Sequence, residues 1–179
     1  MIKKNISTVD SVKQLHDFNQ ESLEQILTIE RDVFPPLMQS SPEEIKTIIS
    51  NKKGIHLLVF NNKKVVGYLS AVPHNDEYPD LIKYDKDFAL DDKALYIDSI
   101  AIKPGHRGLG LARLVFQDLI RIAKQRGFDK IGMHVRVSTG LSQRLQGLSA
   151  VKFIRRLDNW YNFGEPFDYL EISLDKKSS

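Results

Sequence analysis

The sequence predicts a mixed α/β fold with a central, mostly antiparallel sheet, flanking helices and one parallel strand-loop-helix-strand step. Short strands flank an Asn-Asn turn at 61–62, and a buried strand at 96–102 runs through a glycine-bearing turn into an amphipathic helix. Two more strands end the chain. Strands joined by tight turns pair antiparallel, whereas parallel strands need a crossover helix. We therefore expect a binding crevice beside the parallel step.

Length and composition predict one domain at 1–174, with a polar tail at 175–179. The 179 residues are 41% hydrophobic and 27% charged, which is enough for a sizeable core. A balance of 26 basic and 23 acidic residues gives a net charge of +3, too even to indicate a nucleic-acid partner.

The chain has no cysteine, and its five histidines lack metal-ligand spacing, so no metal is expected. No apolar run is long enough for a membrane span, so we expect a cytoplasmic protein without a membrane partner and leave its oligomeric state open.

The first third of the chain predicts two helices. Apolar residues recur at helical spacing over 12–29, broken by a turn near Asn19, and the sequence Phe34-Pro35-Pro36 then stops helix formation. Ser41 is followed by Pro42 at the first helical position and by Glu44 three residues after the cap. This is the arrangement of a capping box, so the second helix is expected to begin there.

The middle of the chain predicts a hairpin and then a surface segment. Residues 56–60 and 64–72 are rich in Val, Leu and aromatic side chains and flank the turn, which is typical of paired strands. Residues 73–93 are rich in Asp and Glu and poor in aliphatic side chains. This composition predicts a solvated surface excursion.

The second half predicts one long helix and then short elements. Apolar residues recur at helical spacing from about Gly110 until Gly127 ends the run. Beyond it we expect a strand, a brief helix and two strands, at 130–137, 141–148, 153–157 and 169–174.

The turn before the long helix is a candidate phosphate site. A helix start offers unpaired N–H groups and the positive end of the macrodipole. Because Gly108 and Gly110 lack side chains, their amides can approach a diphosphate, and Arg107 adds positive charge. The pattern Arg-x-x-Gly-x-Ala is short, so a bare tight turn is the alternative.

With these features the chain resembles the GNAT superfamily of acetyl-CoA-dependent N-acetyltransferases, whose motif A is a strand followed by [Gln/Arg]-x-x-Gly-x-[Gly/Ala] and a helix. Arg107-Gly-Leu-Gly-Leu-Ala112 matches this pattern, and the likeness runs from about residue 26 to residue 174. The resemblance implies a GNAT-like fold and acetyl-CoA as co-substrate. The cofactor-binding residues that it implies are Ile100, Ala101, Ile102, Arg107, Gly108, Leu109, Gly110, Leu111 and Ala112.

Within the superfamily, the acetyltransferases of peptide N-termini, including those of ribosomal proteins, are most similar. Their first helix tends to end in Phe-Pro, as at Phe34 and Pro35, and their penultimate strand leads to Asn-aromatic-Tyr, as at Trp160 and Tyr161. The resemblance implies that these residues contact the substrate. Arylalkylamine acetyltransferases share a similar Phe-Pro region, so that acceptor class stays open.

The same subgroup carries a Tyr on the strand before motif A and a His on the strand after its helix. The resemblance therefore makes Tyr96 and His134 the catalytic pair. Strand alternation puts Asp98 on the face of Tyr96, as a candidate for substrate contact, and adds Ile100 and Ile102 to that face. Packing roles for the pair, and a surface role for Asp98, are the alternatives.

One segment departs from the family pattern. After Ser138 the family usually has Asn-x-x-Ala-x-x-Leu-Tyr, and Gln146 stands here in place of that tyrosine. The tyrosine commonly protonates or hydrogen-bonds the leaving thiolate, whereas Gln donates a hydrogen bond but cannot deliver a proton. A catalytically weak acetyl-CoA-binding module is therefore kept as an alternative.

Amine chemistry favours an α-amine as acceptor. At pH 7 a lysine-like amine costs roughly 4 to 5 kcal/mol to deprotonate, and an α-amine about 1 to 1.5 kcal/mol. A neutral His134, or a water held by it and Tyr96, is expected to take the proton. Without cysteine, direct attack in a ternary complex is simpler than an acetyl-enzyme. We expect acetyl transfer to a primary amine, namely a peptide or protein N-terminus; the alternative is a small amine, a polyamine or an arylalkylamine.

Overall fold

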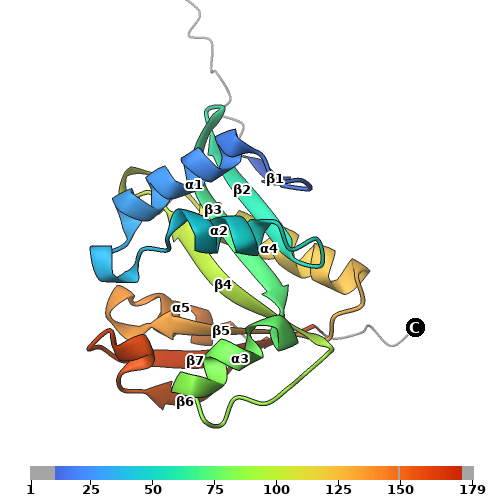
Figure 1. Ribbon diagram of the computed structural model, residues 1–179, viewed down its shortest axis with the longest axis vertical. Helices are drawn as coiled ribbons and strands as arrows, with labels where there is room; N and C mark the ends of the chain where they lie inside the picture. Colours follow the sequence, from blue (N-terminus) through green and yellow to red (C-terminus); the bar gives the residue numbers. More distant parts are fainter. Residues whose placement is uncertain (1–10, 149, 175–179) are drawn as a thin grey trace, which may run out of the picture.

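The protein is described from a computed structural model that covers residues 11–148 and 150–174, so the expected polar tail at 175–179 lies outside the described residues. A seven-stranded sheet has the order β1-β2-β3-β4-β5-β7-β6 (Figure 1). The strands are β1 (Ser11–Gln14), β2 (Ile55–Asn61), β3 (Lys64–Pro73), β4 (Ala94–Ile102), β5 (Lys130–Arg136), β6 (Val151–Leu157) and β7 (Phe167–Ser173). The helices are α1 (Gln20–Val33), α2 (Pro42–Ile49), α3 (His74–Tyr84), α4 (Leu111–Gln125) and α5 (Leu141–Gln146). The pair β4–β5 is parallel and the other strand pairs are antiparallel, as the sequence predicts.

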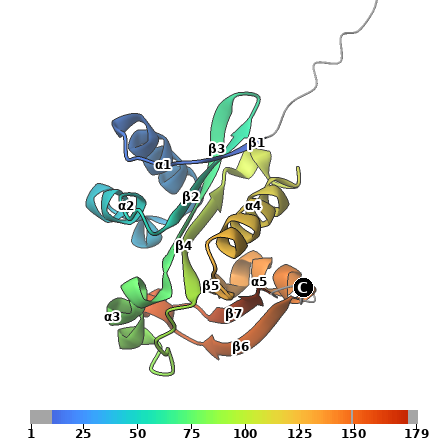
Figure 2. The same ribbon diagram turned by 90° about the vertical axis from the view of Figure 1, so that its right-hand side faces the viewer.

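Helices cover both faces of the sheet. Figure 2 shows α1, α2 and α3 on one side and α4 and α5 on the other. The apolar stripe of α4, including Leu111, Val115 and Leu119, packs on the interior of β2 to β5. On the other face, Ile26 of α1 and Ile45 of α2 pack against Leu58 and Tyr68. The core therefore consists of one layer on each side of the sheet.

The sheet divides along β4. Residues Ala94–Ile97 pair with Lys130–Met133 of β5, but β4 continues to Ile102 with only β3 as a partner in the described chain. Beyond Ile97 the strands β4 and β5 separate, and this divergence lies at the end of the parallel step (Figure 1). One edge of β4 is thus left without a strand.

A β-bulge at Asp98 corrects the expected strand alternation. Ser70 of β3 pairs with Ser99, but its neighbour Ala71 pairs with Ile97, so Asp98 is an extra residue in β4. Because a bulge shifts the side-chain alternation by one residue, Ile100 and Ile102 do not share the face of Tyr96. They pack instead with the α4 layer.

Two further expectations are wrong in part. Val12 lies in β1 opposite Val59, because its backbone completes the sheet edge, whereas the helix begins at Gln20, just after the turn expected near Asn19. The segment 73–93 is not merely solvated: it contains α3, and its residues His74, Asp85 and Phe88 are 2%, 1% and 3% exposed. Those three side chains are buried against the sheet face that carries Tyr96, a contact that composition does not report.

The helix starts are confirmed. Ser41 and Glu44 form the expected capping box, with Ser41 Oγ accepting from Glu44 N at 3.2 Å and Glu44 Oε2 accepting from Ser41 N at 2.7 Å. Gly110 is the N-cap of α4 with φ 82°, a left-handed conformation that glycine adopts without strain. The long helix thus begins where its apolar spacing predicts.

Candidate active site

Tyr96 and His134 meet beside the parallel step. The register places Tyr96 opposite Gly132, and His134 lies two residues further along β5 on the same face. The Tyr96 hydroxyl lies 2.8 Å from His134 Nδ1. The structure therefore brings together two side chains that the sequence placed on separate strands.

Asp85 and Arg155 complete a chain of contacts that the sequence did not reveal. His134 Nε2 lies 3.2 Å from Asp85 Oδ2. Arg155 Nε donates to both oxygens of Asp85 at 2.8 and 2.9 Å, and its second nitrogen also bonds Oδ2. The His134 side chain is 1% exposed and that of Asp85 is 2% exposed. The pattern of acidic residues in 73–93 gave no signal that one of them is buried beneath β5.

The protonation states follow from burial and partners. Burial lowers the pKa of His134 to about 4, although the hydrogen bond to Asp85 opposes this shift, so the imidazole is neutral at pH 7. Burial alone would raise the pKa of Asp85, but hydrogen bonds from His134 and Arg155 outweigh it and hold the pKa at about 2. The Asp85 carboxylate only accepts, so Nε2 of His134 carries the proton and Nδ1 accepts from the Tyr96 hydroxyl.

Aromatic rings enclose the imidazole. Trp160 stacks on His134 with ring centroids 3.6 Å apart and planes at 13°, and the Tyr169 ring lies 4.7 Å away. Trp160, expected to contact the substrate, is 5% exposed and holds His134 in place. Tyr161 has a left-handed φ of 50°, and its ring stacks on Tyr84 at 4.1 Å.

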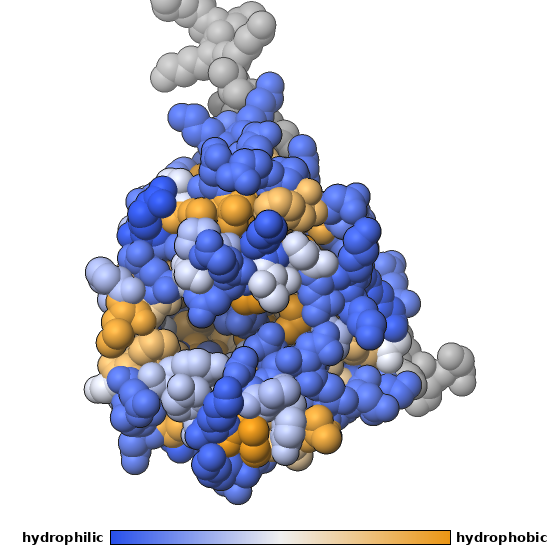
Figure 3. Space-filling view, in the orientation of Figure 1, coloured by the Kyte–Doolittle hydropathy of each residue, from blue (hydrophilic) through white to orange (hydrophobic). Residues whose placement is uncertain are grey.

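The loop between α1 and α2 borders the same cluster. Phe34 is half-buried under α1, whereas Pro35 is exposed. Met38, a few residues on, packs with the cluster that contains Tyr96 and Trp160. In the space-filling view the surface is hollowed between α2 and α3, with hydrophobic residues in its floor (Figure 3). The expected Phe-Pro segment thus leads directly into Met38, which contacts the cluster of Tyr96.

Two carboxylates near Tyr161 have no hydrogen bond or ion pair with any residue that the structure describes. They are Asp98, the bulge residue of β4, and Glu77 of α3. Burial, and then the charges of Glu77 and Glu30, raise the pKa of Asp98 to about 8. Burial and neighbouring aspartates raise the pKa of Glu77 as well. A cation placed between these groups would relieve their mutual repulsion.

The open edge of β4 presents backbone donors. Lys103 N donates to Val66 O at 2.9 Å, and antiparallel pairs alternate between bonded and non-bonded positions. The N–H groups of Ile100 and Ile102 therefore point away from β3, toward the side that β5 leaves. Arg107 Nε donates to the carbonyl of Ile102 at 3.1 Å, so this arginine braces the start of the loop.

The glycine loop is shaped for close approach by a ligand. Gly108 and Gly110 have φ of 79° and 82°, and a Cβ at either position would meet no atom within 4 Å. Leu114 N is the first amide of α4 to bond back, to Gly110 O at 3.1 Å, so the amides of Leu111 and the next two residues have no helical partner. Open space, free amides and the helix dipole together fit a diphosphate.

Gln146 belongs to a separate network on the other face of the sheet. Its Nε2 donates to Ser142 Oγ at 2.8 Å, and Ser142 donates to the buried Asp168. Arg156 Nε donates to Asp168 Oδ1 at 2.7 Å. Gln146 is therefore held within its own helix.

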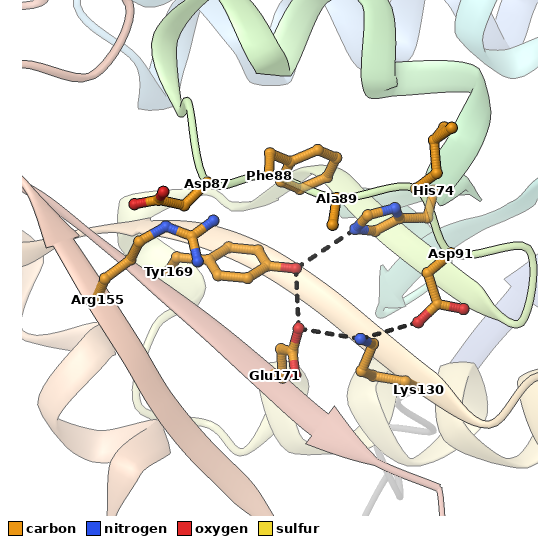
Figure 4. Close-up of a pocket in the computed structure, with 10 residues that line it drawn as sticks. His74, Asp87, Phe88, Ala89, Asp91, Lys130, Arg155, Tyr169 and Glu171 are labelled. Atoms are coloured by element: carbon orange, nitrogen blue, oxygen red, sulfur yellow. Dashed lines mark hydrogen bonds and ion pairs between the residues drawn. The ribbon is translucent and has the colours of Figure 1, made fainter.

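A cavity of about 140 Å³ lies behind the aromatic cluster (Figure 4). There the Tyr169 hydroxyl points between His74 Nε2, at 3.4 Å, and Glu171, at 3.2 Å. Lys130 pairs with Glu171 at 3.1 Å and with Asp91 at 2.9 Å. These polar groups bond to one another, except His74 Nδ1, which has no hydrogen-bond partner among the described residues.

The described residues contain no cluster of His, Cys, Asp and Glu that could hold a metal ion. Within the same residues, no helix is both long enough and apolar enough to cross a membrane.

Comparisons with known proteins agree with this architecture. The ribosomal-protein-S18-alanine N-acetyltransferase from Escherichia coli aligns with a TM-score of 0.72 at 13% identity, over 96% of this chain and 97% of that one. NAA60 from Arabidopsis thaliana, in complex with acetyl-CoA, aligns with a TM-score of 0.68 at 19% identity, over 92% of this chain and 97% of that one. GphF, a GNAT-like decarboxylase in complex with isobutyryl-CoA, gives 0.69 at 13% identity, over 92% and 100%.

At such identities the structural likeness shows the fold, and GphF shows that the fold also occurs in a protein named for another reaction. The sequence itself decides the family. Residues 21–145, well over half of the chain, match the model of the acetyltransferase (GNAT) family. The chain belongs to the acetyltransferase (GNAT) family.

Proposed function

We propose that this protein transfers an acetyl group from acetyl-CoA to a primary amine, the α-amine of a peptide or protein N-terminus, by direct attack in a ternary complex. The observation that carries the proposal is the hydrogen bond between Tyr96 and a neutral, buried His134 at the point where β4 and β5 separate. We also propose that the protein acts in the cytoplasm, as the sequence predicts.

The chain's own backbone supplies the sites that such a co-substrate needs. Acetyl-CoA brings an acetyl thioester, which an amine attacks with the coenzyme A thiolate as leaving group. The free amides at the start of α4 and the loop of Gly108 and Gly110 fit its diphosphate. The outward N–H groups of Ile100 and Ile102 are placed to hold a carbonyl oxygen as negative charge develops on it.

The catalytic pair is suited to an amine that loses its proton readily. As the amine nitrogen attacks, its proton passes to the Tyr96 oxygen while the Tyr96 proton passes to His134 Nδ1. The imidazolium that results is balanced by the Asp85 carboxylate. An α-amine needs about 3 kcal/mol less for deprotonation at pH 7 than a lysine side chain does. The weakly basic His134 therefore favours an α-amine over a lysine side chain.

Departure of the thiolate does not require a general acid. A thiol of pKa about 8.5 leaves readily, and the imidazolium returns its proton through Tyr96 and water to the thiolate. Gln146 is bonded to Ser142 and offers no proton. The loss of the usual tyrosine is therefore compatible with turnover.

A small polycationic amine is the second candidate, and a specific observation favours it. Asp98 and Glu77 are carboxyl groups without a hydrogen-bond or ion-pair partner among the described residues. Burial raises the pKa of Tyr161, and the charge of Asp80 and then those of Glu77 and Asp98 add to the shift, so both groups lie near that ring. Their placement fits an acceptor that carries positive charge beyond its reacting amine. A polyamine satisfies that requirement, and so does a peptide with a basic residue near its N-terminus.

The decisive experiment measures acetyl-CoA-dependent thiol release, with mass spectrometry of the product, on a matched set of acceptors. One peptide is used with a free and with a blocked N-terminus, and both forms keep an internal lysine. Spermidine and tryptamine complete the set. Turnover confined to the free N-terminus is expected.

The other outcomes would support an alternative function or contradict the direct-attack mechanism. Turnover only on spermidine or tryptamine would assign the hollow to a small amine. Acetyl-CoA binding without turnover on any acceptor would contradict the enzyme and leave the binding module. Thiol release in two half-reactions, with acetylated protein accumulating, would overturn direct attack.

A further inference from the structure

Asp85 is the buried end of the chain of contacts that leads to Tyr96. We propose that Asp85, held by Arg155, is a positioning residue for acetyl transfer, which fixes the tautomer and the ring orientation of His134 so that Nδ1 faces the Tyr96 hydroxyl. This inference rests on the proposed function, and it adds a residue outside the motif from Arg107 to Ala112.

Arg155 fixes the carboxylate. Its Nε lies 2.8 Å from Oδ1 and 2.9 Å from Oδ2 of Asp85, and a second guanidinium nitrogen bonds Oδ2. The guanidinium also lies over the Tyr169 ring, 4.6 Å from its centroid. Because the fork is planar and packed on a ring, it allows the carboxylate one orientation. Asp85 is 1% exposed, so water does not compete for these bonds.

The fixed carboxylate then selects the tautomer. An ionised carboxylate has no proton to donate, so His134 must present an N–H at Nε2, 3.2 Å from Oδ2. In the neutral ring the other nitrogen, Nδ1, is then an acceptor. Its partner at 2.8 Å is the Tyr96 hydroxyl. The opposite tautomer would place an N–H against Tyr96 and could not take the Tyr96 proton.

The same carboxylate compensates the charge that forms during transfer. When the Tyr96 proton reaches Nδ1, His134 becomes an imidazolium with N–H groups on both nitrogens. Burial opposes this charge, as the low pKa of His134 shows, and Asp85 is the anion in contact with the ring. Without Asp85, transfer would be slower even if Tyr96 and His134 kept their positions.

The chain contains a matched control. Asp168 is 0% exposed, and Arg156, the neighbour of Arg155 on β6, donates to both its oxygens at 2.7 and 3.1 Å. The other side-chain partner of Asp168 is Ser142 instead of a histidine. Replacing either aspartate with asparagine removes one buried negative charge from an arginine pair, but only Asp85→Asn touches His134.

In Asp85→Asn the side-chain amide cannot form a hydrogen bond with every group that the carboxylate bonded. Either orientation of the Asn side chain turns its NH₂ group toward a donor, on Arg155 or on His134. With NH₂ toward His134, relief requires the imidazole to move its proton to Nδ1, which is the wrong tautomer for accepting from Tyr96. With NH₂ toward Arg155 Nε and the Asp87 amide, His134 keeps its tautomer but loses the anion that compensates the imidazolium. We expect kcat to fall about 100-fold or more, with KM for the acceptor changed less than about threefold. Asp168→Asn is expected to keep kcat within about threefold.

The tautomer is measured separately by ¹⁵N NMR of the imidazole in the free protein, which needs no substrate. The Nε2–H form is expected for wild type and for Asp168→Asn, and a loss of that form is expected for Asp85→Asn. The wild-type spectrum tests the inference even if Asp85→Asn does not fold. An Nδ1–H form in wild type, or an unchanged kcat in a folded Asp85→Asn protein, would overturn it.

These readouts separate the inference from the proposed function. If wild type turns over no acceptor, the proposed function fails while the spectra still report the tautomer. If wild type turns over and both asparagine variants lose kcat equally, the effect is general destabilisation, and the positioning role of Asp85 is refuted.

Discussion

Two adjacent arginines of β6 hold two buried aspartates on opposite faces of the sheet. Arg155 binds Asp85 on the face of Tyr96, and Arg156 binds Asp168 on the face of α5. Neighbouring residues of a strand point to opposite sides, so one short segment serves both faces. The side chain of Arg155 is 22% exposed and that of Arg156 is 50% exposed.

The difference lies in the side chain that bonds each aspartate besides its arginine. Asp168 accepts from the hydroxyl of Ser142, which does not change charge between pH 4 and 9, whereas Asp85 accepts from His134, which can. The same pair of residue types therefore stabilises a helix on one face and controls an imidazole on the other. A buried Asp–Arg pair does not by itself mark a site; its remaining partner does.

The largest effect is expected from breaking the pairs at the arginine. Arg155→Met leaves Asp85 charged and buried without a cation, with hydrogen bonds from His134 and the Asp87 amide alone, which should cost about 3 kcal/mol of unfolding free energy. For a chain of this size that corresponds to a fall in Tm of about 6 to 12 °C. Arg156→Met should cost clearly less, because the half-exposed Arg156 leaves a path for water and Ser142 stays bonded to Asp168. Thermal unfolding of both variants at pH 7 measures the contrast.

Equal losses of Tm in Arg155→Met and Arg156→Met would show that the two pairs are energetically alike. A larger loss in Arg156→Met would contradict the comparison.

The next-largest effect is the pH dependence of the unfolding free energy, which distinguishes the His134 network from the Ser142 network. The folded pKa of His134, about 4, lies below the ordinary value of 6.5, so the unfolded state takes up a proton first as the pH falls. The stabilisation is present above pH 6.5 and is lost between pH 6.5 and 4, by about 2 kcal/mol from pH 7 to pH 5. His74, with a pKa also lowered to about 4 by burial, contributes in the same window. Asp85 is affected only below pH 3.8.

Urea unfolding at pH 7 and pH 5 tests this contrast. His134→Gln should lose about 2 kcal/mol of the pH dependence and keep the rest, which includes the parts due to His74 and to the buried His56, whose pKa burial also lowers. Ser142→Ala should keep the full dependence, since its network has no group that titrates there. A His134→Gln variant with the wild-type pH dependence would show that His134 is not buried as a neutral ring.

Much of the fold follows from local sequence signals. The Ser41 capping box, the start of α4 after Gly110 and the hairpin around 61–62 depend on residues a few positions apart, and the structure has all three. The pairing of Tyr96 with His134 came from the family resemblance, because no local pattern fixes the parallel register. The single parallel step was predicted because a helix separates its strands.

What the sequence did not reveal depends on distant contacts. Asp85 is 49 residues from His134 and 70 from Arg155, and the two residues on either side of it are exposed. The bulge at Asp98 shifts the side-chain alternation of β4, and the strand has no Gly or Pro there that would have predicted it. Both features arise when separate strands and loops pack, so composition and periodicity carry no sign of them.

The smallest effect concerns Gln146, at the end of the Asp168 network. Its amide donates to Ser142 Oγ at 2.8 Å, so it helps to hold α5 rather than to reach a leaving thiolate. Gln146→Ala should change kcat/KM by less than about threefold, which is under about 1 kcal/mol. Gln146→Tyr should also stay within threefold, because a thiolate of ordinary pKa departs without a general acid. Steady-state rates for both variants at saturating acetyl-CoA provide the measurement. A tenfold rise of kcat/KM in Gln146→Tyr would show that protonation of the thiolate limits turnover. A tenfold fall of kcat/KM in Gln146→Ala would show that the amide acts in the reaction. Either result would join the Asp168 network to the chemistry and remove the division between the two faces.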